Sequence, residues 1–136
     1  SSSIYCATKF AVEGFSESLA LEVARFGIHL TIVEPGFFRT DFLDATSVRY
    51  GHKKLVDYDD PQGEPRVDYS AWNHRQPGNP AKLGQALVQI AAWARPPLRF
   101  LAGSDAVAYA RETFDRRRAE MAEHAALSSS TDFAAG

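Results

Sequence analysis

The chain has 136 residues, of which 45% are apolar and 24% are charged, and its formal net charge is −2. This length and composition are ordinary for one domain of a soluble globular protein. A net charge so close to zero provides no bulk attraction to nucleic acid or to an anionic membrane. No apolar run approaches the roughly 20 residues that a membrane span needs. We therefore expect neither nucleic acid nor a membrane among the partners of this chain.

The first residues contain neither a basic leader nor an apolar signal core. Cys6 is the only cysteine, so an internal disulfide is impossible and a reducing compartment fits. From these features we expect a cytoplasmic protein. The chain begins with Ser1 rather than methionine, and we expect it to start inside a larger domain.

A helical pattern runs from about Ile4 to Phe26 and is stopped by Gly27. Apolar residues recur along it every four positions, which places them on one face: Ala11, Phe15, Leu19 and Val23. This stripe predicts packing on a sheet, and it fits a contact with a second subunit equally well.

A short β-branched run over residues 28–33 follows, closed by Glu34-Pro35-Gly36. Because a helix precedes it, we expect a buried parallel strand there. A helix–strand junction this tight is typical of doubly wound α/β sheets.

The helical and strand periods disappear over a long segment, about residues 37–78. A stretch this long without regular structure is uncommon in a compact domain and often acts as a functional lid. We expect a short helix near residues 40–45. Its aromatic residues predict either an apolar substrate pocket or simple anchoring of the loop, and the sequence leaves both open: Tyr50, Tyr58, Tyr69 and Trp72.

A second helix begins at Asn79, as cap, with Pro80 in its first turn, and ends before Pro96. A short strand over residues 98–101 follows.

A third helix, capped by Ser104 or Asp105, reaches about Leu127. We expect residues 128–136 to form a disordered tail. The pattern is that of an α/β fold, but two strands alone cannot form a stable sheet with both faces covered. The chain therefore resembles the second part of a larger α/β domain.

Tyr5 and Lys9 stand four residues apart at the start of the first helix, so they share one face. A phenol has a pKa of about 10, and lowering it to about 7 requires roughly 4 kcal/mol. An ammonium at about 4 Å supplies that much only where the effective dielectric constant is about 20. If a pocket excludes most water from the two side chains, the pair predicts acid–base chemistry. In open solvent, Tyr5 and Lys9 would be an ordinary pair on a helix surface.

Other candidate groups have simpler interpretations. Cys6 lies beside the tyrosine but has no histidine or aspartate at a telling position, so a small packing residue is expected rather than a nucleophile. The histidines show no metal-ligand spacing, and no metal site is predicted from them: His29, His52, His74 and His124.

Several strings together resemble the classical short-chain dehydrogenases/reductases. They are Tyr5-x-x-x-Lys9 with its flanks, Glu34-Pro35-Gly36-Phe37-Phe38-Arg39-Thr40, Asn79-Pro80, and Phe100-Leu101-Ala102-Gly103-Ser104-Asp105-Ala106. The likeness matches only the C-terminal part of the family domain. It implies that residues 1–127 are the C-terminal portion of a doubly wound, Rossmann-like domain with a parallel sheet.

The resemblance also implies roles. Tyr5 would exchange a proton with the substrate oxygen, and Lys9 would assist it and bind the nicotinamide ribose. Pro35 and Gly36 would border the nicotinamide of NAD or NADP, and Thr40 would contact its carboxamide, although Thr40 also fits the cap of a short helix. The implied function is NAD(P)-dependent interconversion of an alcohol and a carbonyl, and family members commonly form homo-oligomers through the equivalent first helix.

Three family features are missing from the sequence: the glycine-rich phosphate loop, the Asn-rich motif with its strand, and an upstream catalytic serine. The first three serines lie too close to Tyr5 for that last role, so we read them as loop and cap residues. An alternative is therefore a catalytically incomplete fragment that acts at most as an interaction module. A third hypothesis is a lyase or epimerase that uses the same Tyr-Lys pair. The Pro-Gly-x-x-x-Thr string fits the classical dehydrogenases better than it fits this hypothesis.

Overall fold

The computed structural model describes residues 3–48 and 69–133 of the chain. Its helices and strands lie in the order α1 (Ser3–Val23), β1 (Ile32–Pro35), α2 (Pro80–Ala91), β2 (Arg99–Ala102) and α3 (Ser104–Ser129). Within the described residues, three 3-10 helices accompany them: η1 (Ala24–Phe26), η2 (Asp41–Leu43) and η4 (Tyr69–Trp72). Tyr50, Tyr58 and the side chain of Tyr69, which we named as candidate pocket residues, lie outside the described part.

The first helix forms where the sequence predicts it, and its last three residues tighten into η1. Gly27 ends it with φ of 70°, a left-handed conformation that costs glycine little. Its N–H donates to the carbonyl oxygen of Ala24 at 3.0 Å. The stop signal read from Gly27 is therefore confirmed.

The two strands pair in parallel, with Ile32 opposite Arg99 and Pro35 opposite Ala102. This confirms the α/β class and the parallel sheet. The first strand begins four residues later than predicted, at Ile32 rather than residue 28. A segment forms a strand only where a neighbouring strand pairs with it. Among the described residues, β2 begins at Arg99, which pairs with Ile32, so residues 28–31 have no partner in β2.

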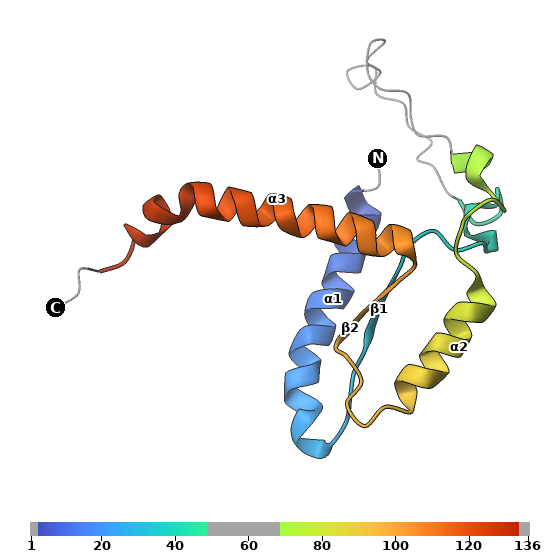
Figure 1. Ribbon diagram of the computed structural model, residues 1–136, viewed down its shortest axis with the longest axis horizontal. Helices are drawn as coiled ribbons and strands as arrows, with labels where there is room; N and C mark the ends of the chain where they lie inside the picture. The colour runs from blue at the N-terminus through green and yellow to red at the C-terminus, as the bar shows by residue number, and fades with distance from the viewer. Residues whose placement is uncertain (1–2, 49–68, 134–136) are drawn as a thin grey trace, which may run out of the picture.

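The helices α1 and α2 lie on opposite faces of this sheet, as Figure 1 shows. Side chains alternate between the two faces along a strand. Glu34 and Arg99 share the face toward α1, because Arg99 also contacts two glutamates of that helix. Val33 points the other way and lines a hollow of about 410 Å³ with Leu87 and Ile90 of α2. Coverage of both faces is the arrangement of a doubly wound domain.

The second helix begins at its predicted signal, whereas the predicted cap of the third is wrong: its N-cap is Gly103, and the Asp105 carboxylate accepts from the Phe37 N–H instead of capping the helix. The Asn79 side chain accepts hydrogen bonds from the N–H groups of Ala81 at 2.9 Å and Lys82 at 3.3 Å, as an N-cap does. The third helix starts directly after β2 and projects away from the sheet (Figure 1), ending at Ser129. No helix in the described residues has the length and apolarity to cross a membrane.

The buried core of the described residues is small. Its apolar members are Ile32, Ile90 and Ala102. The apolar stripe of α1 is only partly covered: Leu19 and Val23 are half-buried, whereas Phe15 is 67% exposed. Packing on this narrow sheet thus accounts for only the C-terminal half of the stripe.

Charged groups hold α1 to the sheet. The guanidinium of Arg99 on β2 pairs with Glu13 at 3.0 Å and Glu17 at 2.8 Å on α1, and with Glu34 on β1. The hydrogen bonds that Arg99 donates to these carboxylates, that to Glu17 first, raise the pKa of Arg99 above its ordinary value. The side of α1 that carries Glu13 and Glu17 therefore turns toward the strands.

Replacing Arg99 with Met is expected to lower the free energy of unfolding by about 1–2 kcal/mol, because three carboxylates lose their shared cation and then repel one another. Urea unfolding of the protein measures the loss. Arg117→Met, on the exposed surface of α3, is the control and should change stability by less than about 0.5 kcal/mol. Equal losses in the two variants would contradict the proposed role of the cluster.

Candidate active site

The Tyr5 and Lys9 side chains lie together on the first turns of α1. The ammonium nitrogen of Lys9 is 5.4 Å from the centre of the Tyr5 ring and lies over its face. A cation over the face of an aromatic ring is attracted by the ring's quadrupole, by about 0.5–1 kcal/mol at an exposed site. The helical spacing therefore does bring the phenol and the ammonium into contact.

The described residues do not enclose this pair. Tyr5 is 49% exposed, and Lys9 and the neighbouring Cys6 are also exposed. The expectation that Cys6 is a packing residue therefore has no support in this part of the chain. The hollow against α2 lies elsewhere, as does one of about 340 Å³ between β2 and α3. The water-excluding pocket that acid–base chemistry requires must come from outside the described residues.

The Pro35–Gly36 turn leaves β1 at its carboxyl end, where open α/β sheets bind ligands. The N–H of Gly36 donates to the carbonyl oxygen of Ala102 at 2.9 Å, and the N–H of Phe37 donates to the Asp105 carboxylate at 2.7 Å. A Cβ at Gly36 would overlap that same carboxylate, so only glycine fits here without a shift. The turn is thus fixed from both β2 and α3.

Thr40 caps η2. Its hydroxyl oxygen accepts a hydrogen bond from the N–H of Phe42 at 3.3 Å, and its backbone is extended. The structure therefore bears out the cap that the sequence also allowed for Thr40. A hydroxyl that accepts one hydrogen bond retains its own proton for donation, so the cap does not exclude contact with a ligand.

Two stretches of the long loop run side by side after β1 and before α2. Phe38 forms an isolated parallel bridge with Gly78, the N–H of Gly78 donates to the Phe37 carbonyl at 2.9 Å, and that of Arg39 donates to the Gly78 carbonyl at 2.9 Å. The guanidinium of Arg39 also donates to the Gln76 carbonyl, at 3.1 Å from its terminal nitrogen. The first and last residues of the loop are therefore hydrogen-bonded to each other.

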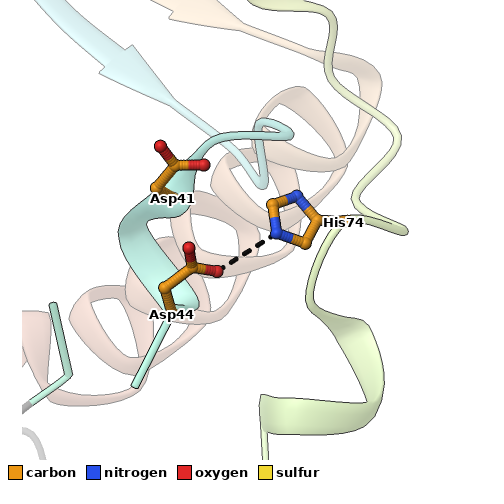
Figure 2. Close-up of side chains that lie close together, drawn as sticks. All are labelled: Asp41, Asp44 and His74. Carbon is orange, nitrogen blue, oxygen red and sulfur yellow. Dashed lines mark ion pairs between the residues drawn. The ribbon is translucent and has the colours of Figure 1, made fainter. Parts of the chain in front are cut away.

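A polar cluster joins the two stretches farther out. Figure 2 shows Asp41 and Asp44 on one side and His74 on the other, with His74 Nε2 3.1 Å from Asp44 Oδ1. The side-chain nitrogen of Asn73 donates to the same Asp44 oxygen. One potential ligand atom from each of Asp41, Asp44 and His74 lies within 4.8 Å of the others. The hydrogen bonds and ion pair of Asp44 account for its placement without an ion.

Among the described residues, two aromatic pairs lie at the start and end of the long loop, and one of them includes Tyr5. The rings of Tyr5 and Phe42 have centroids 6.1 Å apart, and those of Phe37 and Trp72 are 6.2 Å apart. Phe42 lies on η2 and Trp72 on η4, two turns that contact each other. Phe42 is 61% exposed and Trp72 55% exposed. Phe42 therefore presents free ring surface beside the phenol, and these four rings together are called the aromatic group.

The donors around this site fit one end of a nicotinamide cofactor. Lys9 is exposed and has no ion-pair partner within residues 3–48 and 69–133, so its three N–H donors are available to ribose hydroxyls. The Thr40 hydroxyl and the backbone of the Pro35–Gly36 turn lie at the same end of the sheet. The fit covers only the nicotinamide and its ribose, because the sequence contains no glycine-rich phosphate loop.

Comparison with known proteins gives a consistent result. Residues 1–50 match the family model described as short chain dehydrogenase. The crystal structure of a short-chain dehydrogenase from Streptomyces avermitilis is similar over 98% of this chain, with a TM-score of 0.79 and 36% sequence identity. The chain belongs to the short-chain dehydrogenase family.

Curated members of the short-chain dehydrogenase family are similar in sequence. The 3-ketodihydrosphingosine reductase of Bacteroides thetaiotaomicron is 39% identical over 99 residues, which are 73% of this chain and 36% of that protein. Human retinol dehydrogenase 5 is 54% identical over 44 residues, which are 32% of this chain and 14% of that protein. The chain thus spans well under half the length of these relatives, and it covers 47% of the Streptomyces chain.

Two features of this short-chain dehydrogenase site were missed in the sequence. The Asp44–His74 pair joins residues 30 positions apart, which no local spacing reveals. Asp105 was read only as a helix cap, although its carboxylate reaches the turn after β1. The available signal was its place two residues after Gly103, which has φ of 104° and whose Cβ position the Asp105 carboxylate occupies.

Proposed function

We propose that the complete protein is an NAD(P)-dependent oxidoreductase that interconverts an alcohol and a carbonyl, with Tyr5 as the proton donor and acceptor. The observation that most supports this proposal is the Lys9 ammonium over the Tyr5 ring, at the end of the sheet where the Pro35–Gly36 turn emerges. Family membership supports the same chemistry.

A nicotinamide cofactor, when bound, supplies the hydride chemistry. The residues of this chain supply placement and protons. The Tyr5 hydroxyl gives its proton to the substrate oxygen during reduction and takes one back during oxidation, which relieves the charge that develops there. Lys9 stabilises the resulting phenolate as a nearby cation and holds ribose hydroxyls. Thr40 and the backbone of the Pro35–Gly36 turn hold the nicotinamide end.

The aromatic group indicates the class of substrate. Phe42 next to Tyr5 offers exposed apolar ring surface where the body of the substrate would lie, and the Phe37–Trp72 pair offers more on the same loop. Two relatives are named for a retinol and for a 3-ketodihydrosphingosine, both largely apolar molecules. We therefore propose an alcohol or ketone on a large apolar body, held by these rings.

A substrate series tests this function. The complete protein is assayed with NAD⁺ and NADP⁺ against secondary alcohols from 2-propanol to 2-decanol. We expect kcat/KM to rise with chain length, by up to about fourfold for each buried methylene. Absence of turnover with every alcohol, together with absence of saturable NADH and NADPH binding, would contradict the oxidoreductase and favour the catalytically incomplete fragment.

The same series tests the aromatic group through Phe42→Ala. This change should lower kcat/KM for 2-decanol by about tenfold and change it little for 2-propanol, because only the longer alcohol reaches the ring. Phe114→Ala is the matched control, a half-exposed phenylalanine on α3 far from Tyr5 in sequence, and should leave the series unchanged. A uniform loss across the series would exclude a role in selecting apolar substrates.

We also propose that the exposed side of α1 contacts protein outside the described residues. Phe10 and Phe15 on this helix are 62% and 67% exposed. A second subunit or the remainder of the domain would cover them, and the predicted homo-oligomer through the first helix is one such arrangement.

A further inference from the structure

The Asp105 carboxylate connects the third helix to the turn that leaves β1. Its Oδ2 accepts a hydrogen bond from the N–H of Phe37 at 2.7 Å, across 68 positions of sequence. The preceding N–H, that of Gly36, is held by the Ala102 carbonyl of β2. Two consecutive N–H groups of the turn are therefore anchored by two different elements.

The carboxylate occupies a slot between two glycines. A Cβ at Gly36 or at Gly103 would overlap the Asp105 side chain, and Gly103 also adopts φ of 104°, which other residues rarely adopt. Asp105 lies in the first turn of α3, where the partial positive charge of the helix favours an anion. A charged acceptor also forms a stronger hydrogen bond to an N–H than a neutral one.

We propose that Asp105 is a positioning residue that sets the backbone of Pro35, Gly36 and Phe37 against the nicotinamide end of the cofactor. This inference rests on the proposed function, because it assigns a purpose to the turn that borders the cofactor. Asp105 touches neither cofactor nor substrate in this arrangement. It acts through the Phe37 N–H, which it alone anchors among the described residues.

The direct test is amide hydrogen exchange at Phe37 in the complete protein, without any cofactor. Asp105→Ala should accelerate exchange of the Phe37 amide by at least about tenfold and leave the Gly36 amide, which bonds to Ala102, nearly unchanged. Asp105→Asn retains an acceptor oxygen and should restore most of the protection. Asp115→Ala, elsewhere on α3, is the matched control and should change neither amide.

The functional readout is cofactor affinity. We expect Asp105→Ala to raise the Kd for NADH or NADPH and the KM for the cofactor about tenfold, with the KM for the alcohol nearly unchanged and partial rescue by Asp105→Asn. Faster Phe37 exchange with unchanged cofactor affinity would overturn the positioning role and leave the proposed function standing. Unchanged Phe37 exchange in both variants would also overturn it. If the wild-type protein binds neither NADH nor NADPH, the proposed function fails and this inference fails with it.

Discussion

Tyr5→Phe is expected to reduce kcat for alcohol oxidation by about 10²–10⁴-fold, the range that a positioned proton donor or acceptor contributes. The phenylalanine keeps the ring that lies against Lys9 and Phe42 and removes only the hydroxyl. Binding of NADH should therefore change by less than about threefold, because the lost group acts on the substrate oxygen. Steady-state kinetics and a fluorescence titration of the complete protein measure the two quantities.

Tyr109→Phe is the matched control for this prediction. Tyr109 is 71% exposed on α3 and should lose neither turnover nor cofactor binding when its hydroxyl is removed. If Tyr5→Phe retained more than about a tenth of the wild-type kcat, the proton would have to pass through another group, and the proposed mechanism would be wrong.

Gly36→Ala is expected to lower the free energy of unfolding by about 1–3 kcal/mol, the usual cost of forcing a group into filled space. The new Cβ would overlap the Asp105 carboxylate, which would then have to leave the Phe37 N–H. Urea unfolding of the complete protein measures the loss.

The overlap between a Cβ at Gly36 and the Asp105 carboxylate also predicts how the two substitutions combine. In the Asp105→Ala background the carboxylate is gone, so adding Gly36→Ala should cost clearly less than it does alone, and the two changes should be non-additive. Gly84→Ala is the matched control, because nothing lies within 4 Å of a Cβ there. In the interior of α2 it should stabilise the protein by roughly 0.5–1 kcal/mol. Additive losses at Gly36 and Asp105 would show that the two residues do not share the slot.

Helices were the part of this fold that local sequence predicted well. Gly27 stops the first helix through its left-handed backbone, and Asn79 with Pro80 starts the second through a side-chain cap. These signals act within a few residues, so the pattern contains all the information needed. The start of β1 was predicted too early, because residues 28–31 have strand-like side chains but no described strand beside them.

In the candidate site, too, local sequence predicted one part and missed another. Contact between Tyr5 and Lys9 follows from helical spacing alone, and the structure places the ammonium over the ring. The enclosure that the chemistry needs is a property of everything packed around the pair. Tyr5 is half exposed in this part of the chain, which local spacing could not reveal.

The sequence by itself determined the helices and the motif pair, since each depends on neighbours within one or two turns, and the alternation of helices and strands along the chain indicated the parallel sheet. Only the tertiary structure decided that Glu13 and Glu17 face Arg99, that Asp44 meets His74, and that Asp105 fills the slot beside Gly36. Those contacts join residues 30 to 86 positions apart. Their geometry depends on how the strands and helices pack, which no local periodicity encodes.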